Sequence, residues 1–123
     1  MKILLAEDDL VSQRITSLLL EKVGCNVSVV GDGKDVLVAL EKRPFDLVLM
    51  DVHMIDLDGP ETAVAIRRGD AGEANKDIPI IALTACAMAG DKERFFKVGM
   101  NGYTEKPLEL EKLGQELQRI MLS

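Results

Sequence analysis

The stretch Asp46-Leu47-Val48-Leu49-Met50-Asp51 combines a run of four apolar residues with an acid at each end. Four consecutive apolar residues cannot alternate between a buried and a solvated face, so this run predicts a strand covered by helices on both faces. In open α/β sheets, ligands bind at the carboxyl ends of such strands. We therefore expect this strand to deliver the Asp51 carboxylate to a functional edge of a parallel sheet.

The rest of the chain repeats this unit, because short predicted strands alternate with segments of helical periodicity. The predicted strands are 3–6, 26–30, 46–51, 78–83 and 99–104. The first predicted helix is marked by Val11, Ile15, Leu18 and Leu19, the second ends before Pro44, and the third starts at Asp58-Gly59-Pro60. The fourth is the segment 87–98, and the last runs from Leu110 to near Ser123. Five such units predict a parallel sheet with right-handed crossovers and helices on both faces.

Composition limits the possible functions of the 123 residues, which we expect to form a single domain, 1–123. Fifteen Lys and Arg against twenty-one Asp and Glu give a net charge of -6, the wrong sign for binding nucleic acid. Cys25 and Cys86 lack metal-ligand spacing, and reduced thiols are the default in the cytoplasm. No apolar run has the length of a membrane span or a signal peptide, so we expect a cytoplasmic protein without membrane insertion.

Polar side chains follow four of the predicted strands. They are Glu7 and Asp8 after the first, Asp51 after the third, Thr84 after the fourth and Lys106 after the fifth. Two carboxylates about 4 Å apart repel by about 4 kcal/mol at an effective dielectric near 20, so an edge with three of them needs a cation. Oxygen ligands of this hardness suit Mg²⁺, which commonly sits beside phosphate.

These residues carry a resemblance to a known family. The order and spacing of these motifs resemble those of CheY-like receiver domains of bacterial response regulators. The motifs are Glu7-Asp8, Asp51 with Asp58-Gly59, Thr84-Ala85 and Lys106-Pro107. The resemblance covers essentially the whole chain, and the segments 78–91 and 99–108 look especially like receivers of hybrid sensor histidine kinases. It implies a flavodoxin-like, doubly wound (βα)5 fold with a five-stranded parallel sheet in the order 2-1-3-4-5.

By this resemblance Asp51 is the phosphoacceptor of a two-component phosphorelay. Its carboxylate would take a phosphoryl group from a histidine kinase or a histidine phosphotransfer protein. The Thr84 hydroxyl and the Lys106 ammonium would contact the phosphoryl oxygens. The chain would be a signalling domain that promotes its own phosphorylation and dephosphorylation and acts through a downstream effector protein or domain, not an enzyme with its own substrate.

The resemblance implies Mg²⁺ as the cofactor, with Mn²⁺ as an alternative. Asp8 and Asp51 would bind the metal directly, the backbone carbonyl of His53 would be a third protein ligand, and Glu7 would act through metal-bound water. The His53 imidazole is not expected to bind, because Mg²⁺ prefers oxygen donors. A cis peptide bond between Lys106 and Pro107 is also implied.

Signal output is implied to run through Thr84 and Tyr103. On phosphorylation Thr84 would move inward and Tyr103 would exchange an exposed for a buried rotamer. This would remodel the surface formed by the predicted fourth helix, fifth strand and final helix. His53 and Cys86 stand where the family tunes the lifetime of the phosphoryl group. Ile55 departs from the family, which usually has Pro there, so the loop is expected to be less rigid.

Two other functions remain open at this point. A phosphatase of the haloacid dehalogenase type also uses an aspartyl nucleophile with Mg²⁺, but it needs a second Asp where His53 stands. A receiver-like module that binds partners without being phosphorylated is the other alternative. The intact acids, Thr84 and Lys106 argue against that module, while Ile55 keeps it open.

Overall fold

The computed structural model describes residues 1–54, 56–85 and 87–122. Its strands are β1 (Lys2–Ala6), β2 (Asn26–Val30), β3 (Leu47–Asp51), β4 (Ile80–Thr84) and β5 (Gly102–Glu105). Its α-helices are α1 (Leu10–Lys22), α2 (Gly33–Lys42), α3 (Gly59–Arg68), α4 (Asp91–Lys97) and α5 (Leu110–Leu122), with a short 3-10 helix at Glu73–Asn75. The strands are parallel and lie in the order β2-β1-β3-β4-β5, which confirms the predicted flavodoxin-like topology.

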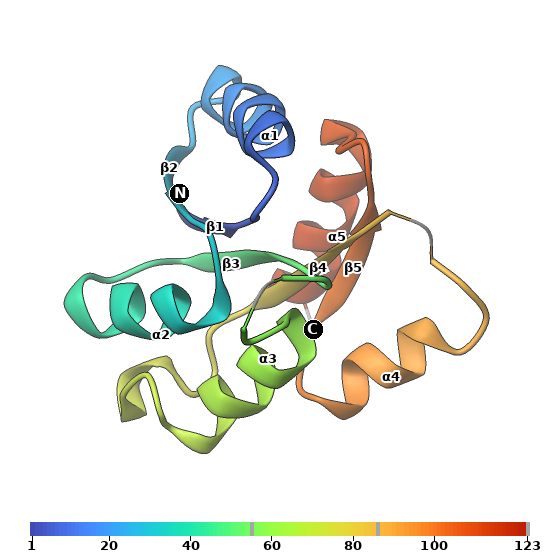
Figure 1. Cartoon of the computed structure of the whole chain (residues 1–123). Helices are drawn as coiled ribbons and strands as arrows, with labels where there is room; N and C mark the ends of the chain where they lie inside the picture. The colour runs from blue at the N-terminus through green and yellow to red at the C-terminus, as the bar shows by residue number, and fades with distance from the viewer. Residues whose placement is uncertain (55, 86, 123) are drawn as a thin grey trace.

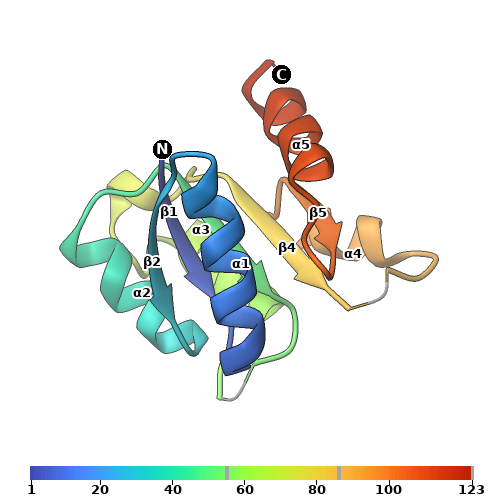
Figure 2. The same cartoon turned by 90° about the horizontal axis from the view of Figure 1, so that it is seen from above.

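Helices cover both faces of this sheet (Figure 1). Viewed from above, α1 lies across the sheet face and α5 lies at the β5 side of the molecule (Figure 2). Leu47 and Leu49 of β3 pack in a core with residues of α1 and α5, whereas Val48 and Met50 pack with residues of α2, α3 and α4. All five residues of β3 are buried, as its continuous apolar run predicts. Within the described ranges, no helix is long and apolar enough to cross a membrane.

The boundaries of α4 and β5 differ from the predicted ones. Helix α4 begins at Asp91, not Ala87, because Gly90 adopts a left-handed conformation (φ +89°) and the Asp91 carboxylate accepts a hydrogen bond from the Met88 amide. Strand β5 begins at Gly102, not Gly99, which ends α4 in a left-handed turn (φ +98°). Gly90 and Gly99 therefore shorten α4 and β5, because glycine readily adopts the left-handed conformation that ends a helix or strand.

Helix α1 is present, but its apolar stripe does not face the core. Val11, Ile15 and Leu18, whose spacing predicted the helix, are 66%, 49% and 56% exposed. The residues that α1 buries against the sheet are Thr16 and Leu20. The spacing therefore identified a helix correctly, but three of the residues that marked it form an exposed apolar surface.

Candidate functional site

Three acids meet at the carboxyl edge of the sheet. Glu7 and Asp8 follow β1 directly, and Asp51 is the last residue of the neighbouring strand β3. One carboxylate oxygen from each acid lies within 4.8 Å of the others. Glu7 and Asp51 are buried and Asp8 is exposed, so the cluster is open to solvent on the Asp8 side.

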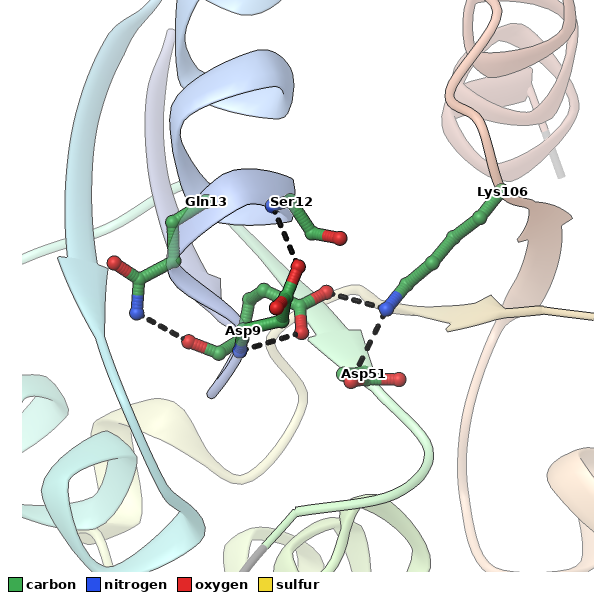
Figure 3. Close-up of polar contacts among 6 residues, drawn as sticks. Asp9, Ser12, Gln13, Asp51 and Lys106 are labelled. Atoms are coloured by element: carbon green, nitrogen blue, oxygen red, sulfur yellow. Dashed lines mark hydrogen bonds and ion pairs between the residues drawn. The ribbon is translucent and has the colours of Figure 1, made fainter.

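Lys106 reaches this cluster from the end of β5 (Figure 3). Its Nζ lies 2.5 Å from Glu7 Oε2 and 3.2 Å from Asp51 Oδ2. The Lys106 side chain is only 24% exposed, so these ion pairs are partly shielded from water. The peptide bond between Lys106 and Pro107 is cis, in agreement with the expectation. The Lys106 ammonium therefore bridges Asp51, the candidate nucleophile, and Glu7, the most deeply buried acid of the cluster.

The ionisation of Glu7 and Lys106 is altered by this contact. Burial raises the pKa of the Glu7 carboxyl, and the hydrogen bond from Lys106 opposes that effect without cancelling it. Burial lowers the pKa of the Lys106 ammonium, but the hydrogen bond to Glu7 and the charge of Asp51 outweigh it, so the net pKa is raised. Lys106 is therefore firmly cationic at neutral pH.

Thr84 and Tyr103 also lie near this edge. Thr84 is the last residue of β4 and is buried, and its backbone carbonyl accepts a hydrogen bond from the Lys106 amide at 2.7 Å. Tyr103, on β5, is half-buried with its ring centroid 6.1 Å from that of Phe95 in α4. The threonine is thus tied through the backbone to the lysine, and the tyrosine contacts α4.

The loop after Asp51 is closed at its base. The Gly59 amide donates to the Val52 carbonyl at 3.0 Å, and the Gly33 amide of α2 donates to the Leu57 carbonyl at 3.3 Å. A Cβ atom on Gly59 would lie 2.5 Å from the Asp51 carbonyl oxygen, so only glycine fits at position 59. Asp58 caps α3 through a reciprocal capping box with Glu61, which anchors the far end of the loop.

His53 lies on this loop and is exposed, two residues beyond the nucleophile candidate. The binding of a metal by the His53 backbone carbonyl stays a prediction. The influence of the His53 side chain on the phosphoryl lifetime also stays a prediction. Ile55 and Cys86, named for loop rigidity and phosphoryl lifetime, lie outside the described residues.

Two contacts at the site were not anticipated. One is the direct ion pair of Lys106 with Glu7, which the sequence places at opposite ends of the chain. The other is a hydrogen bond from the Gln13 side-chain amide to the Glu7 backbone carbonyl (Figure 3). Gln13 belongs to no motif, and its only sequence signal is a place in the first turn of α1, one turn after Asp9.

The donor set fits a divalent cation. Three carboxylates and one ammonium leave a net charge of −2 when all are ionised, on oxygen atoms of the kind that Mg²⁺ prefers. Lys106 contacts Glu7 and Asp51, while the exposed Asp8 carboxylate has no ion pair or hydrogen bond within the described part of the chain. Asp8 is therefore the acid of the cluster that has no cationic partner among the described residues.

Comparison with known proteins identifies the family. The model of the response regulator receiver domain matches residues 3–118. The chain is a receiver domain. It is 39% identical to hybrid signal transduction histidine kinase K of Dictyostelium discoideum over 121 residues, 95% of this chain and 10% of that protein. It is 40% identical to transcription factor SKN7 of Saccharomyces cerevisiae over 119 residues, 97% of this chain and 18% of that protein.

Solved receiver domains have the same fold. The receiver domain of a sensor histidine kinase from Pseudomonas aeruginosa PAO1, solved with a magnesium ion in its active site cleft, superposes with a TM-score of 0.85 at 38% identity. That alignment covers 99% of this receiver domain and 98% of that chain. CheY4 of Vibrio cholerae also gives a TM-score of 0.85, at 30% identity and 97% coverage of both chains.

The receiver domain belongs to two-component signalling, in agreement with the resemblance drawn from its motifs. Its relatives include hybrid signal transduction histidine kinases, as the segments 78–91 and 99–108 suggested. The chain spans 10%, 12% and 6% of the length of the first three of these curated relatives. Family membership argues against the haloacid dehalogenase alternative.

Proposed function

We propose that this receiver domain accepts a phosphoryl group on Asp51 from the phosphohistidine of a histidine kinase or a histidine phosphotransfer protein. The observation that carries the proposal is the contact of the Asp51 carboxylate with the Lys106 ammonium, at 3.2 Å, inside a cluster of three acids. A carboxylate beside a fixed positive charge suits the capture of a phosphoryl group. The cytoplasmic location, the downstream effector and the Mn²⁺ alternative stay predictions.

The transfer itself is a displacement at phosphorus. An Asp51 carboxylate oxygen attacks the phosphorus atom, the P–N bond of the donor phosphohistidine breaks, and its electron pair stays on the imidazole nitrogen. The product is a mixed carboxylic–phosphoric anhydride on Asp51. Lys106 donates its N–H groups to the phosphoryl oxygens, and Thr84 donates its hydroxyl, so both stabilise the charge on the transferring group.

The acids of the site have separate roles in this proposal. Asp8 and Asp51 would hold Mg²⁺ directly, together with the His53 backbone carbonyl, and Glu7 would act through water. When bound, Mg²⁺ supplies positive charge that reduces the repulsion between the acids and the phosphoryl group. Glu7 also holds Lys106 in place through the 2.5 Å ion pair, which keeps the ammonium near Asp51.

We also propose that phosphorylation switches the surface of α4, β5 and α5 through Thr84 and Tyr103. The new group adds about −1.5 to −2 charge and three acceptor oxygens, which attract the Thr84 hydroxyl. Support comes from the position of the Tyr103 ring, which is half-buried and packs at 6.1 Å from Phe95 of α4. A change in the Tyr103 rotamer would therefore alter the packing of α4.

The exposed apolar face of α1 is a suitable docking surface for the protein that donates the phosphoryl group. It consists of Leu10, Val11, Ile15 and Leu18, which are 49–76% exposed. Helix α1 starts directly after the acid cluster, so a partner seated on this face lies beside Asp51. A histidine kinase or phosphotransfer helix with an apolar face around its phosphohistidine has the complementary chemistry.

Substitution of Val11 and Leu18 by Ser tests this docking surface. Each side chain buried at an interface hot spot contributes more than about 1 kcal/mol, so the double variant should slow phosphotransfer from a phosphorylated partner by about tenfold or more. Phosphorylation by acetyl phosphate should be unchanged, because that donor needs no docking. The matched control replaces Val38 and Val64, exposed on α2 and α3, with Ser. Equal loss in both double variants would contradict the assignment.

The proposed function is tested with the wild-type domain. With Mg²⁺ and acetyl phosphate, intact-mass spectrometry should detect one added phosphoryl group, and removal of Mg²⁺ with EDTA should prevent it. Phosphotransfer from a panel of radiolabelled histidine kinases should then identify a fast donor. If no donor modifies the protein and beryllium fluoride does not bind, the domain is a receiver-like interaction module, and the proposal is wrong.

A further inference from the structure

The backbone between Glu7 and Asp9 is held by the first turn of α1. Gln13 Nε2 donates to the Glu7 carbonyl oxygen at 2.5 Å. The Glu7 amide bonds to the Val30 carbonyl, so in a continuing parallel ladder the Glu7 carbonyl would face the Asp32 amide. Asp32 is instead the N-cap of α2, where the chain turns away. Gln13 therefore satisfies a carbonyl that strand β2 leaves without its regular partner.

Asp8 lies between two peptide groups that are both fixed. The preceding peptide carries the Glu7 carbonyl, which accepts the Gln13 hydrogen bond. The following peptide carries the Asp9 amide, which donates to Glu7 Oε1 at 3.1 Å. Asp9 is held further by capping α1, since its carboxylate accepts from the Ser12 amide at 2.9 Å. The Asp8 carboxylate is exposed and unpaired in the described part of the chain, so these contacts hold Asp8 in place through its backbone alone.

We propose that Gln13 is a positioning residue that orients Asp8 for metal binding. Mg²⁺ demands nearly ideal octahedral geometry, so a ligand on a mobile backbone must be ordered when the ion binds. A ligand that is already ordered avoids that cost, which is the general advantage of preorganisation. Loss of an outer hydrogen-bond partner of a metal ligand typically weakens metal binding by about 10–100-fold. Gln13 acts through the backbone, so a loss of about tenfold is expected.

A purely structural role for Gln13 makes a different prediction. If the hydrogen bond only stabilised α1, its removal would lower the denaturation midpoint and leave the Mg²⁺ affinity of the folded protein unchanged. A positioning role changes the Mg²⁺ affinity and the Mg²⁺ concentration needed for half-maximal phosphorylation. It leaves the rate at saturating Mg²⁺ near the wild-type value, because Asp51, Thr84 and Lys106 are untouched.

The test variant is Gln13→Met, which keeps the length of the side chain and removes its donor. The matched control is Gln118→Met, an exposed position on α5. Mg²⁺ alone is titrated while amide chemical shifts of residues 7–9 are followed by NMR. We expect the Mg²⁺ dissociation constant to rise about tenfold in Gln13→Met and to stay unchanged in Gln118→Met. Gln13→Ala provides a second variant without the donor in case the methionine disturbs folding.

Two results would overturn the inference. One is a Mg²⁺ dissociation constant within twofold of wild type in a folded Gln13 variant. The other is a phosphorylation rate that stays low at saturating Mg²⁺, which would assign Gln13 to the transfer step. The inference rests on the proposed metal-dependent function, and the outcomes are separable. Wild-type protein that binds Mg²⁺ without accepting a phosphoryl group contradicts only the proposed function.

Discussion

Substitution of Asp51 by Asn is expected to abolish phosphorylation by acetyl phosphate and by any histidine kinase partner. The amide oxygen is a poor nucleophile, and no other acid of the cluster lies at the end of β3 beside Lys106. Intact-mass spectrometry after incubation with Mg²⁺ and acetyl phosphate measures the added phosphoryl group directly. The expected loss is complete within the detection limit of the measurement.

Asp56→Asn is the matched control for this experiment. Asp56 lies on the same loop with a left-handed backbone (φ +66°), a conformation that asparagine also tolerates. The Asp56→Asn variant should accept a phosphoryl group on Asp51 as the wild type does. If Asp51→Asn still gains a phosphoryl group, or if both variants lose it, Asp51 is not the specific acceptor. Amide NMR spectra of the two variants establish whether each remains folded.

Substitution of Lys106 by Met is expected to have the second largest effect. The ammonium is the only side-chain cation within ion-pair distance of Glu7 and Asp51 among the described residues. Removal of one electrostatic donor from a catalytic site typically costs about 100–1,000-fold in rate, and we expect a loss of this size in phosphorylation at saturating Mg²⁺. Initial rates with radiolabelled acetyl phosphate provide the measurement.

The same variant should bind Mg²⁺ more tightly. The single positive charge of Lys106 is shared between Glu7 and Asp51, so its removal makes the acid cluster more negative and more attractive to the metal. The free energy of unfolding should fall, by less than the 3–5 kcal/mol typical of a fully buried broken pair, because the lysine is 24% exposed. Lys112→Met, which removes an exposed lysine on α5, is the control. Slower transfer combined with weaker Mg²⁺ binding would contradict the proposed role of the ammonium.

The fold and the meeting of the acids followed from local patterns in the sequence. Apolar runs mark β1, β3 and β4, and parallel topology brings strand ends such as Asp51 and Lys106 to one edge. The helix start predicted at Asp58 also followed from local rules, and Asp58 is the N-cap of α3. These features depend on short-range chemistry, which a single sequence displays.

Other features depend on tertiary contacts that a pattern does not contain. The apolar spacing of Val11 and Leu18 predicts a helix but does not state which face the sheet covers. The start of α4 depends on the left-handed backbone of Gly90. The apolar spacing does not reveal that backbone conformation. Gln13 was missed because its importance arises from the missing ladder partner of Glu7, a property of where strand β2 ends.

The closed loop between Asp51 and α3 makes the position of the Asp51 backbone independent of which side chains the outer part of the loop carries. The Gly59 amide nitrogen lies 3.0 Å from the Val52 carbonyl oxygen, and Gly59 packs against the Asp51 carbonyl. The two ends of the loop therefore lie next to each other. Its outer residues, including His53, can therefore be exchanged during evolution without displacing the nucleophile. Natural variation and laboratory libraries can reshape the surroundings of the acceptor while the backbone that carries it stays constant, provided that position 59 remains glycine.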